Sequence, residues 1–214
     1  MSNHNMTKLD IPQLTALILL VVVSYLGAMK FFLDGSQVYL ADYLLRAFLI
    51  GFFVLTFGMN GLFKGQSRLK DVFWASGIII VLLVLEKIVT QTEAAENFDS
   101  LLFDPVGFPK IENDLLLKFD LTLGLILVSL SEESIFRVAF VKIAEVKNWP
   151  VTKLYVLSTL LFAFMHFPQG LVGTVTAAVF GLVLMYFYRR TQSFLFVVVA
   201  HTLVNVWFFA PSYF

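Results

Sequence analysis

Cysteine is absent from this chain, and histidine and charge are scarce. Its 214 residues include three histidines, and 14% of the positions are Asp, Glu, Lys or Arg. The lack of cysteine excludes disulfides, thiolate metal sites and a cysteine nucleophile. The formal net charge is zero, which gives no indication of a nucleic acid partner. The G-x-S-x-G motif of serine hydrolases and the H-E-x-x-H motif of zinc proteases are also missing.

Apolar residues make up 59% of the chain, against about 45–50% in a soluble domain. A helix that spans a bilayer needs about 20 mostly apolar residues. We therefore expect an all-α, polytopic membrane helix bundle that forms a single domain over 1–214, with its motif-bearing core at 116–211. No small-residue cleavage site is evident, so the first span is expected to be uncleaved. The seven predicted spans are 13–33, 39–60, 71–88, 116–141, 150–167, 171–188 and 193–211.

The charges between these spans alternate in sign. Lys8 precedes the first span, Lys and Arg cluster in the loops after the second, fourth and sixth spans, and the 89–115 connector is acidic. By the positive-inside rule, the N-terminus is predicted to be cytoplasmic and the C-terminus to be outside. In the second span, Asp42 and Arg46 are four residues apart and can pair. Gly173, Ala177 and Gly181 form a small-residue ridge that would let another helix of the bundle approach closely.

Three charged residues interrupt the apolar run of the fourth span. Glu132 and Glu133 are adjacent, and Arg137 follows Glu133 by one helical turn. An ionisable group near the middle of a bilayer costs about 2.5–3.5 kcal/mol on insertion scales and usually faces the protein interior. Glu133 and Arg137 share a helix face, so we expect them to pair. These charges indicate a functional site inside the bundle.

Four polar side chains from three spans are predicted to lie at one depth. At 1.5 Å per helical residue, Glu132 lies about 15 Å from the cytoplasmic charge at its helix end, and His166 about 20 Å. The same calculation places His201 and Asn205 about 12–20 Å from the cytoplasmic charge at their helix end. All four therefore reach the middle of an apolar layer about 30 Å thick. We expect a carboxylate, two imidazoles and an amide to meet in one buried site.

This set of groups fits the hydrolysis of an amide by water. Glu132 beside His166 could hold and deprotonate a water molecule. His201 and Asn205 could donate hydrogen bonds to the oxyanion that forms at the attacked carbonyl. This route needs no cofactor. The alternative chemistry is a zinc ion held by Glu132, His166 and His201 with water as the fourth ligand.

Three motifs carry a family resemblance. The chain has E-E-x-x-x-R at 132–137, F-x-x-x-H at 162–166 and H-x-x-x-N at 201–205, in this order and each on a predicted span. Together they resemble the CAAX protease and bacteriocin-processing (Abi) family of intramembrane glutamic proteases, which is related to the type II CAAX prenyl endopeptidases. The stretch 190–193 also looks like that family's approach to its third motif. The resemblance covers about residues 120–206.

The resemblance implies an intramembrane peptidase. In it, Glu132 and His166 would activate the water, and His201 and Asn205 would line the oxyanion hole. The implied substrate is a membrane-associated peptide or protein, prenylated or not. The implied location is the membrane of a bacterial or archaeal cell, as a multi-pass protein in contact with lipid and without nucleic acid.

The remaining motif residues would have supporting roles. Glu133 and Arg137 would support the site by pairing, and Phe162 would fix its helix by packing. A second hypothesis is a non-catalytic membrane protein, for immunity or for regulation of signalling, that keeps the protease fold. A proton-coupled transporter is a third, because buried Glu and His groups also relay protons. The absence of an internal repeat in the sequence disfavours it.

Overall fold

A computed structural model of the chain describes residues 36–57, 69–90 and 110–209. Over these residues it contains helices and turns and no β-strand, which confirms the all-α fold class. The elements are α2 (Ser36–Phe57), α4 (Leu69–Thr90), α6 (Asp114–Phe119), η1 (Asp120–Gly124), α7 (Leu125–Glu133), η2 (Ser134–Ala139), α8 (Phe140–Val146), α9 (Val151–Met165), η3 (Phe167–Gln169), α10 (Gly170–Thr191) and α11 (Phe194–Phe209). The expected span 13–33 and most of the acidic connector lie outside the described residues.

Each of the other six expected spans coincides with helix in the structure. Two of these helices contain stretches long and apolar enough to cross a membrane, Gln37–Leu55 and Phe167–Thr191, while α9 and α11 are apolar but shorter. The number of spans and the position of the N-terminus stay predictions.

The fourth expected span, 116–141, is part of a longer and less regular helix. One continuous rod runs from Asp114 to Val146, and two π-helical segments, η1 and η2, interrupt it. It begins where the side chain of Asn113 accepts a hydrogen bond from the Leu116 amide at 3.0 Å, which is an N-cap. It ends in a turn where Asn148 has a left-handed backbone with φ of 51°. We call residues 114–146 the motif helix.

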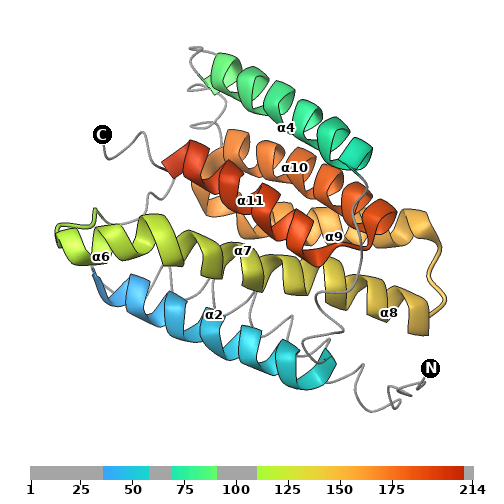
Figure 1. Cartoon of the computed structure of the whole chain (residues 1–214), viewed down its shortest axis with the longest axis horizontal. Helices are drawn as coiled ribbons and strands as arrows, with labels where there is room; N and C mark the ends of the chain where they lie inside the picture. Colours follow the sequence, from blue (N-terminus) through green and yellow to red (C-terminus); the bar gives the residue numbers. More distant parts are fainter. Residues whose placement is uncertain (1–35, 58–68, 91–109, 210–214) are drawn as a thin grey trace.

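The motif helix lies between α2 on one side and α11 on the other (Figure 1). Helices α9 and α10 pack against each other, and α4 lies on α10 at the edge of the bundle. The hydroxyl of Tyr43 on α2 donates to Asp120 on the motif helix at 2.5 Å. A Cβ atom on Gly124 would meet the Tyr43 ring at 3.2 Å, so glycine allows this close approach. Helix α2 is therefore fixed against the motif helix.

The helices run along one axis, which gives the bundle two ends (Figure 1). At one end, here called the Ser36 end, α2, α6 and α10 begin and α9 and α11 finish. At the other, the Arg190 end, α8 and α10 finish and α9 and α11 begin. The position of a residue along its helix therefore tells which end it is near.

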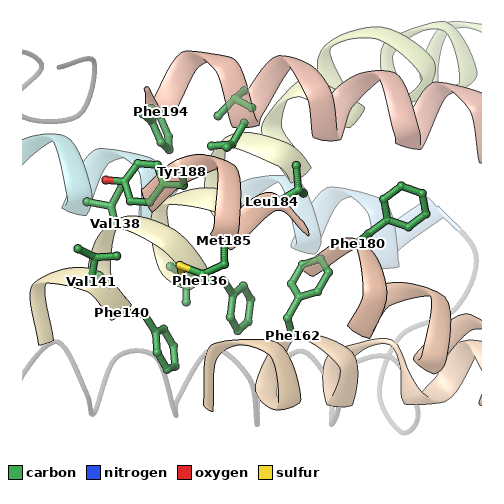
Figure 2. Packing of buried hydrophobic residues seen from close by; sticks show 14 of the residues in the cluster. Phe136, Val138, Phe140, Val141, Phe162, Phe180, Leu184, Met185, Tyr188 and Phe194 are labelled. Atoms are coloured by element: carbon green, nitrogen blue, oxygen red, sulfur yellow. The ribbon is translucent and has the colours of Figure 1, made fainter. Parts of the chain in front are cut away.

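Buried apolar side chains from several helices form one large core (Figure 2). Phe136 and Phe140 of the motif helix stack on each other, with their ring centroids 6.1 Å apart. Phe162 of α9 meets Phe136 edge to face at 5.2 Å. Gly181 on α10 lies so close to Phe162 that an added Cβ would come within 2.9 Å of the ring. Of the predicted small-residue ridge, Gly181 thus packs against α9, whereas Gly173 and Ala177 line a cavity.

Candidate active site

The motif helix carries its charges into the most buried part of the bundle. Every residue from 131 to 141 is buried. Glu132 and Glu133 end α7, and Arg137 lies in the π-helical segment η2. Such π-helical turns inside α-helices are frequent at functional sites. The Ser158 hydroxyl of α9 donates to the Phe136 carbonyl of this segment at 2.7 Å, which fixes α9 to the motif helix beside the charges.

Glu133 and Arg137 form the ion pair that the sequence predicts. The Arg137 Nε atom lies 2.9 Å from Glu133 Oε2, and both side chains have 0% exposure. The His201 ring on α11 donates from Nδ1 to Glu133 Oε1 at 2.8 Å, because a carboxylate can only accept. Glu133 therefore neutralises Arg137 and also sets the orientation of the His201 ring.

The two oxygens of Glu132 have different surroundings. Oε1 accepts a hydrogen bond from Arg46 Nη1 at 3.0 Å. Oε2 is buried and has no hydrogen-bond partner among the described residues. It lies 3.8 Å from His201 Nε2, which is too long for a direct hydrogen bond. One oxygen is therefore held in place while the other can accept from a water molecule or a substrate.

Arg46 is a member of this site that reasoning from the sequence missed. It is buried on α2, and its Nε atom donates to Asp42 at 2.6 Å, which confirms the predicted Asp42–Arg46 pair. Its Nη1 atom reaches Ser131 at 2.9 Å as well as Glu132. The sequence could have indicated this pairing, because an arginine inside an apolar span needs a buried partner. Glu132 was the buried carboxylate for which the sequence had suggested no basic partner.

His166 lies just past the end of α9 and is held by its own helix. Its Nδ1 atom is 2.8 Å from the Phe162 carbonyl. A carbonyl only accepts, so Nδ1 carries the proton, and in a neutral imidazole Nε2 is then an acceptor. The Phe162 ring centroid lies 4.7 Å from that of His166 and 5.9 Å from that of His201. Phe162 therefore packs against both imidazoles, as its supporting role requires.

Asn205 follows His201 by one turn of α11. Its side-chain nitrogen is buried and has no hydrogen-bond acceptor among the described residues. Asn205 and His201 both line the same cavity, so their predicted common helix face is confirmed. An amide N–H buried without a partner costs free energy. That cost is relieved when an acceptor, such as a substrate oxygen, enters the cavity.

The side chains meet at a cavity of about 420 Å³. Its polar lining includes Glu132, His166, His201 and Asn205, and it also includes Asp42 and Arg46. Much of the remaining wall is apolar and comes from α7, α10 and α11, with Val128, Phe180, Leu184, Val204 and Phe208 among its residues. The structure therefore brings the four predicted catalytic residues to one cavity. Glu133 and Arg137 are fully buried beside Glu132 and do not line the cavity.

The geometry also bears on metal binding. Within the described ranges, no group of three or more His, Cys, Asp or Glu side chains is arranged to hold a metal ion. The guanidinium of Arg46 lies on Glu132, and its positive charge would repel a cation at that carboxylate. Catalysis without a cofactor stays a prediction, and the zinc alternative is open to direct measurement.

Comparison with known proteins finds a likeness between part of the chain and a protein family. Residues 115–207 match the family model described as Rce1-like, type II CAAX prenyl endopeptidase Rce1-like. The match includes all three motifs, and it confirms the resemblance inferred from them. No curated protein matches the chain, and no solved structure matches it. The likeness of this segment to the family supports a protease kind of activity, and two described helices are long and apolar enough to cross a membrane.

Proposed function

We propose, taking the Rce1-like segment at residues 115–207 as the premise, that this protein is an intramembrane endopeptidase of the glutamic type. Its substrate would be a membrane-associated peptide or protein, prenylated or not. The observation that carries the proposal is the cavity, which joins Glu132, His166, His201 and Asn205. At this cavity a buried carboxylate oxygen and a buried amide nitrogen both lack protein partners among the described residues.

The proposed reaction begins with a water molecule bound by Glu132 Oε2 and His166 Nε2. Both atoms are acceptors, so each can take one of the two protons of the water in a hydrogen bond. Glu132 removes one proton, and the water oxygen attacks the carbonyl carbon of the scissile amide. The carbonyl oxygen becomes an oxyanion. When the tetrahedral intermediate collapses, the C–N bond breaks and the proton held by Glu132 passes to the leaving amine, which gives a carboxylic acid and an amine as products.

Asn205 and His201 are proposed to stabilise the oxyanion. The Asn205 amide donates a hydrogen bond that it lacks in the resting protein, so its contribution appears as charge develops. His201 can donate from Nε2 only when Nδ1 and Nε2 both carry protons, since Nδ1 already donates to Glu133. Arg46 and Glu133 act through other residues: Arg46 orients Glu132, and Glu133 orients His201.

The proposal is tested by comparing membrane peptides from cells that express the wild type with those from cells that express Glu132→Gln. The glutamine keeps an oxygen for Arg46 but is a far weaker base than the carboxylate. A matched control is Glu145→Gln, which removes an exposed carboxylate from a surface ion pair. We expect a set of cleaved peptides to disappear in Glu132→Gln and to persist in Glu145→Gln. The identified peptide then serves as the substrate for the purified protein.

A different result would favour the non-catalytic hypothesis. Identical peptide sets in the wild type and Glu132→Gln, at equal protein levels, would contradict proteolysis by this site. Under that hypothesis, the Glu132→Ala, His166→Ala double variant should retain the cellular phenotype of the wild type. Loss of the phenotype at normal expression would count against it.

A further inference from the structure

The lining of the active-site cavity carries more negative than positive charge. Among the described residues that form it, Arg46 is the basic one, and the acidic ones are Asp42, Glu86, Asp120 and Glu132. A positive charge on His201 would still leave the carboxylates in excess. Charge buried in an apolar bundle costs free energy unless an opposite charge compensates it. The cavity is therefore expected to favour a cationic group.

Asp42 places one of these carboxylates beside the proposed catalytic residue. Its Oδ2 atom accepts a hydrogen bond from Arg46 Nε at 2.6 Å, and Nη1 of the same guanidinium donates to Glu132 at 3.0 Å. A single guanidinium thus separates the two carboxylates. The Oδ1 atom of Asp42 is buried and has no hydrogen-bond partner among the described residues. It can therefore accept a charge-assisted hydrogen bond from a cation bound in the cavity.

Asp120 adds a second negative charge on the same side of the cavity. It lies near the Ser36 end of the motif helix and accepts a hydrogen bond from the Tyr43 hydroxyl of α2. This hydroxyl orients the carboxylate but does not neutralise it. The charged side chains that interact electrostatically with Asp120 are Asp42 and Arg46. The two aspartates are therefore close enough to act on the same cation.

The part of the lining that comes from α10 and α11 is largely apolar. It includes Ala177, Phe180, Leu184, Val204 and Phe208. Lysine and arginine side chains combine an apolar stem with a charged end, so the stem can lie along this wall while the charged end reaches Asp42. Two buried polar atoms without protein partners among the described residues, Glu132 Oε2 and Asn205 Nδ2, belong to the same cavity. They can hold a peptide bond next to the bound cation.

We propose that Asp42, supported by Asp120, forms a subsite for a lysine or arginine side chain close to the scissile bond. The substrate is then a membrane-associated peptide whose apolar sequence contains a basic residue near the cleavage site. Asp42 determines specificity in addition to holding Arg46. This inference rests on the proposed endopeptidase function.

The test measures the binding of three peptides to the detergent-purified full chain. Each is a short apolar peptide, acetylated and amidated at its ends, with lysine, norleucine or glutamate at its centre. Norleucine has the carbon stem of lysine without the charge, and acetylation leaves lysine as the only cation. Fluorescence anisotropy with a neutral label gives the dissociation constants. Empty micelles are the blank, and mass spectrometry verifies that the peptides stay intact during the measurement.

We expect the lysine peptide to bind the wild type about 10-fold more tightly than the norleucine peptide, as one close charge pair allows, and the glutamate peptide to bind most weakly. Asp42→Asn keeps an oxygen for Arg46 and should remove most of this preference. Asp120→Asn, which keeps an oxygen for Tyr43, should reduce it. Asp114→Asn removes an exposed carboxylate from the same helix and should retain the full preference.

Equal affinities of the lysine and norleucine peptides for the wild type would overturn the proposal, as would the absence of binding by all three. So would a preference that persists in Asp42→Asn. The readout is the ratio of two affinities in one variant, so a shift of Arg46 and Glu132 that weakens both peptides alike does not imitate loss of the subsite. Binding does not require hydrolysis, so failure of this inference can be distinguished from failure of the endopeptidase proposal, which the Glu132→Gln comparison decides.

Discussion

Arg46 on α2 and Glu132 on the motif helix form a buried ion pair across 86 positions of sequence, with 3.0 Å between Nη1 and Oε1. The pair lies at the wall of the cavity, and it leaves the second oxygen of Glu132 without a protein partner among the described residues. A carboxylate that must act as a base is thereby fixed by one oxygen and available through the other.

Arg46→Gln should lower kcat about 10- to 100-fold, because a misplacement of about 1 Å can reduce a rate about 100-fold. Arg46→Lys keeps the charge but offers a single nitrogen in place of the guanidinium fork, so an intermediate kcat is expected. Hydrolysis of the identified peptide by detergent-purified protein measures both. Lys142→Gln, at an exposed ion pair, is the control. A wild-type kcat in Arg46→Gln would contradict the role given to Arg46.

Arg137→Ala should destabilise the protein by about 3–5 kcal/mol, because it leaves Glu133 buried without its cation. The matched change is Lys142→Ala, which breaks the exposed pair with Glu145 at 3.0 Å and should cost less than about 1 kcal/mol. Thermal unfolding in detergent, followed by intrinsic tryptophan fluorescence, compares the two variants. Equal losses would mean that burial of the Glu133–Arg137 pair does not matter for stability.

Gly181→Ala should reduce kcat by about 10- to 100-fold through Phe162. The added Cβ would meet the Phe162 ring at 2.9 Å, so the ring must move, and it packs against both imidazoles. A displacement of about 1 Å in a reacting group is enough for such a loss. Gly77→Ala is the control, since a Cβ at that position has no heavy atom within 4 Å. Unchanged kinetics in Gly181→Ala would show that Phe162 does not position the histidines.

Asn205→Ala should lower kcat about 100- to 1000-fold with a smaller effect on KM, which is the usual result of removing one oxyanion donor. Steady-state kinetics on the identified peptide give both constants. Thr202→Ala removes a nearby polar group whose hydroxyl bonds the Val198 carbonyl of its own helix, and it should leave kcat close to that of the wild type. A rise in KM alone in Asn205→Ala would assign Asn205 to substrate binding.

Strong chelators should leave the activity unchanged. The guanidinium of Arg46 pairs with the carboxylate of Glu132, which would be a ligand in the zinc alternative. The reaction proposed above uses no metal. The measurement is the hydrolysis rate before and after treatment with a chelator, together with the zinc content of the purified protein. Activity that is lost with the chelator and restored by zinc would reverse this conclusion.

Much of the fold could be predicted from local patterns. Long apolar runs marked six of the helices, and a spacing of four residues marked the Asp42–Arg46 and Glu133–Arg137 pairs, which the structure confirms. Such patterns report on one helix at a time. The segments η1 and η2 were not foreseen, because apolar periodicity does not show where the hydrogen bonding of a helix shifts by one residue.

The contacts between helices could be predicted only in part. The distance of each residue from the cytoplasmic end of its helix predicted that Glu132, His166, His201 and Asn205 lie at one depth in the membrane. In the structure all four line the same cavity. They could not show which helix lies next to which, so the bonds from Arg46 to Glu132 and from His201 to Glu133 were missed. These bonds depend on the packing of α2 and α11 against the motif helix.

The position of Arg46 has a consequence for defining the smallest working unit of this protein. The segment that carries the family likeness begins at residue 115, yet the counter-ion of its leading glutamate comes from Ser36–Phe57. A truncated version starting at 115, or a chimaera that exchanges only this segment with a homologue, would lack the guanidinium that neutralises Glu132. Shortened or recombined versions should therefore retain α2.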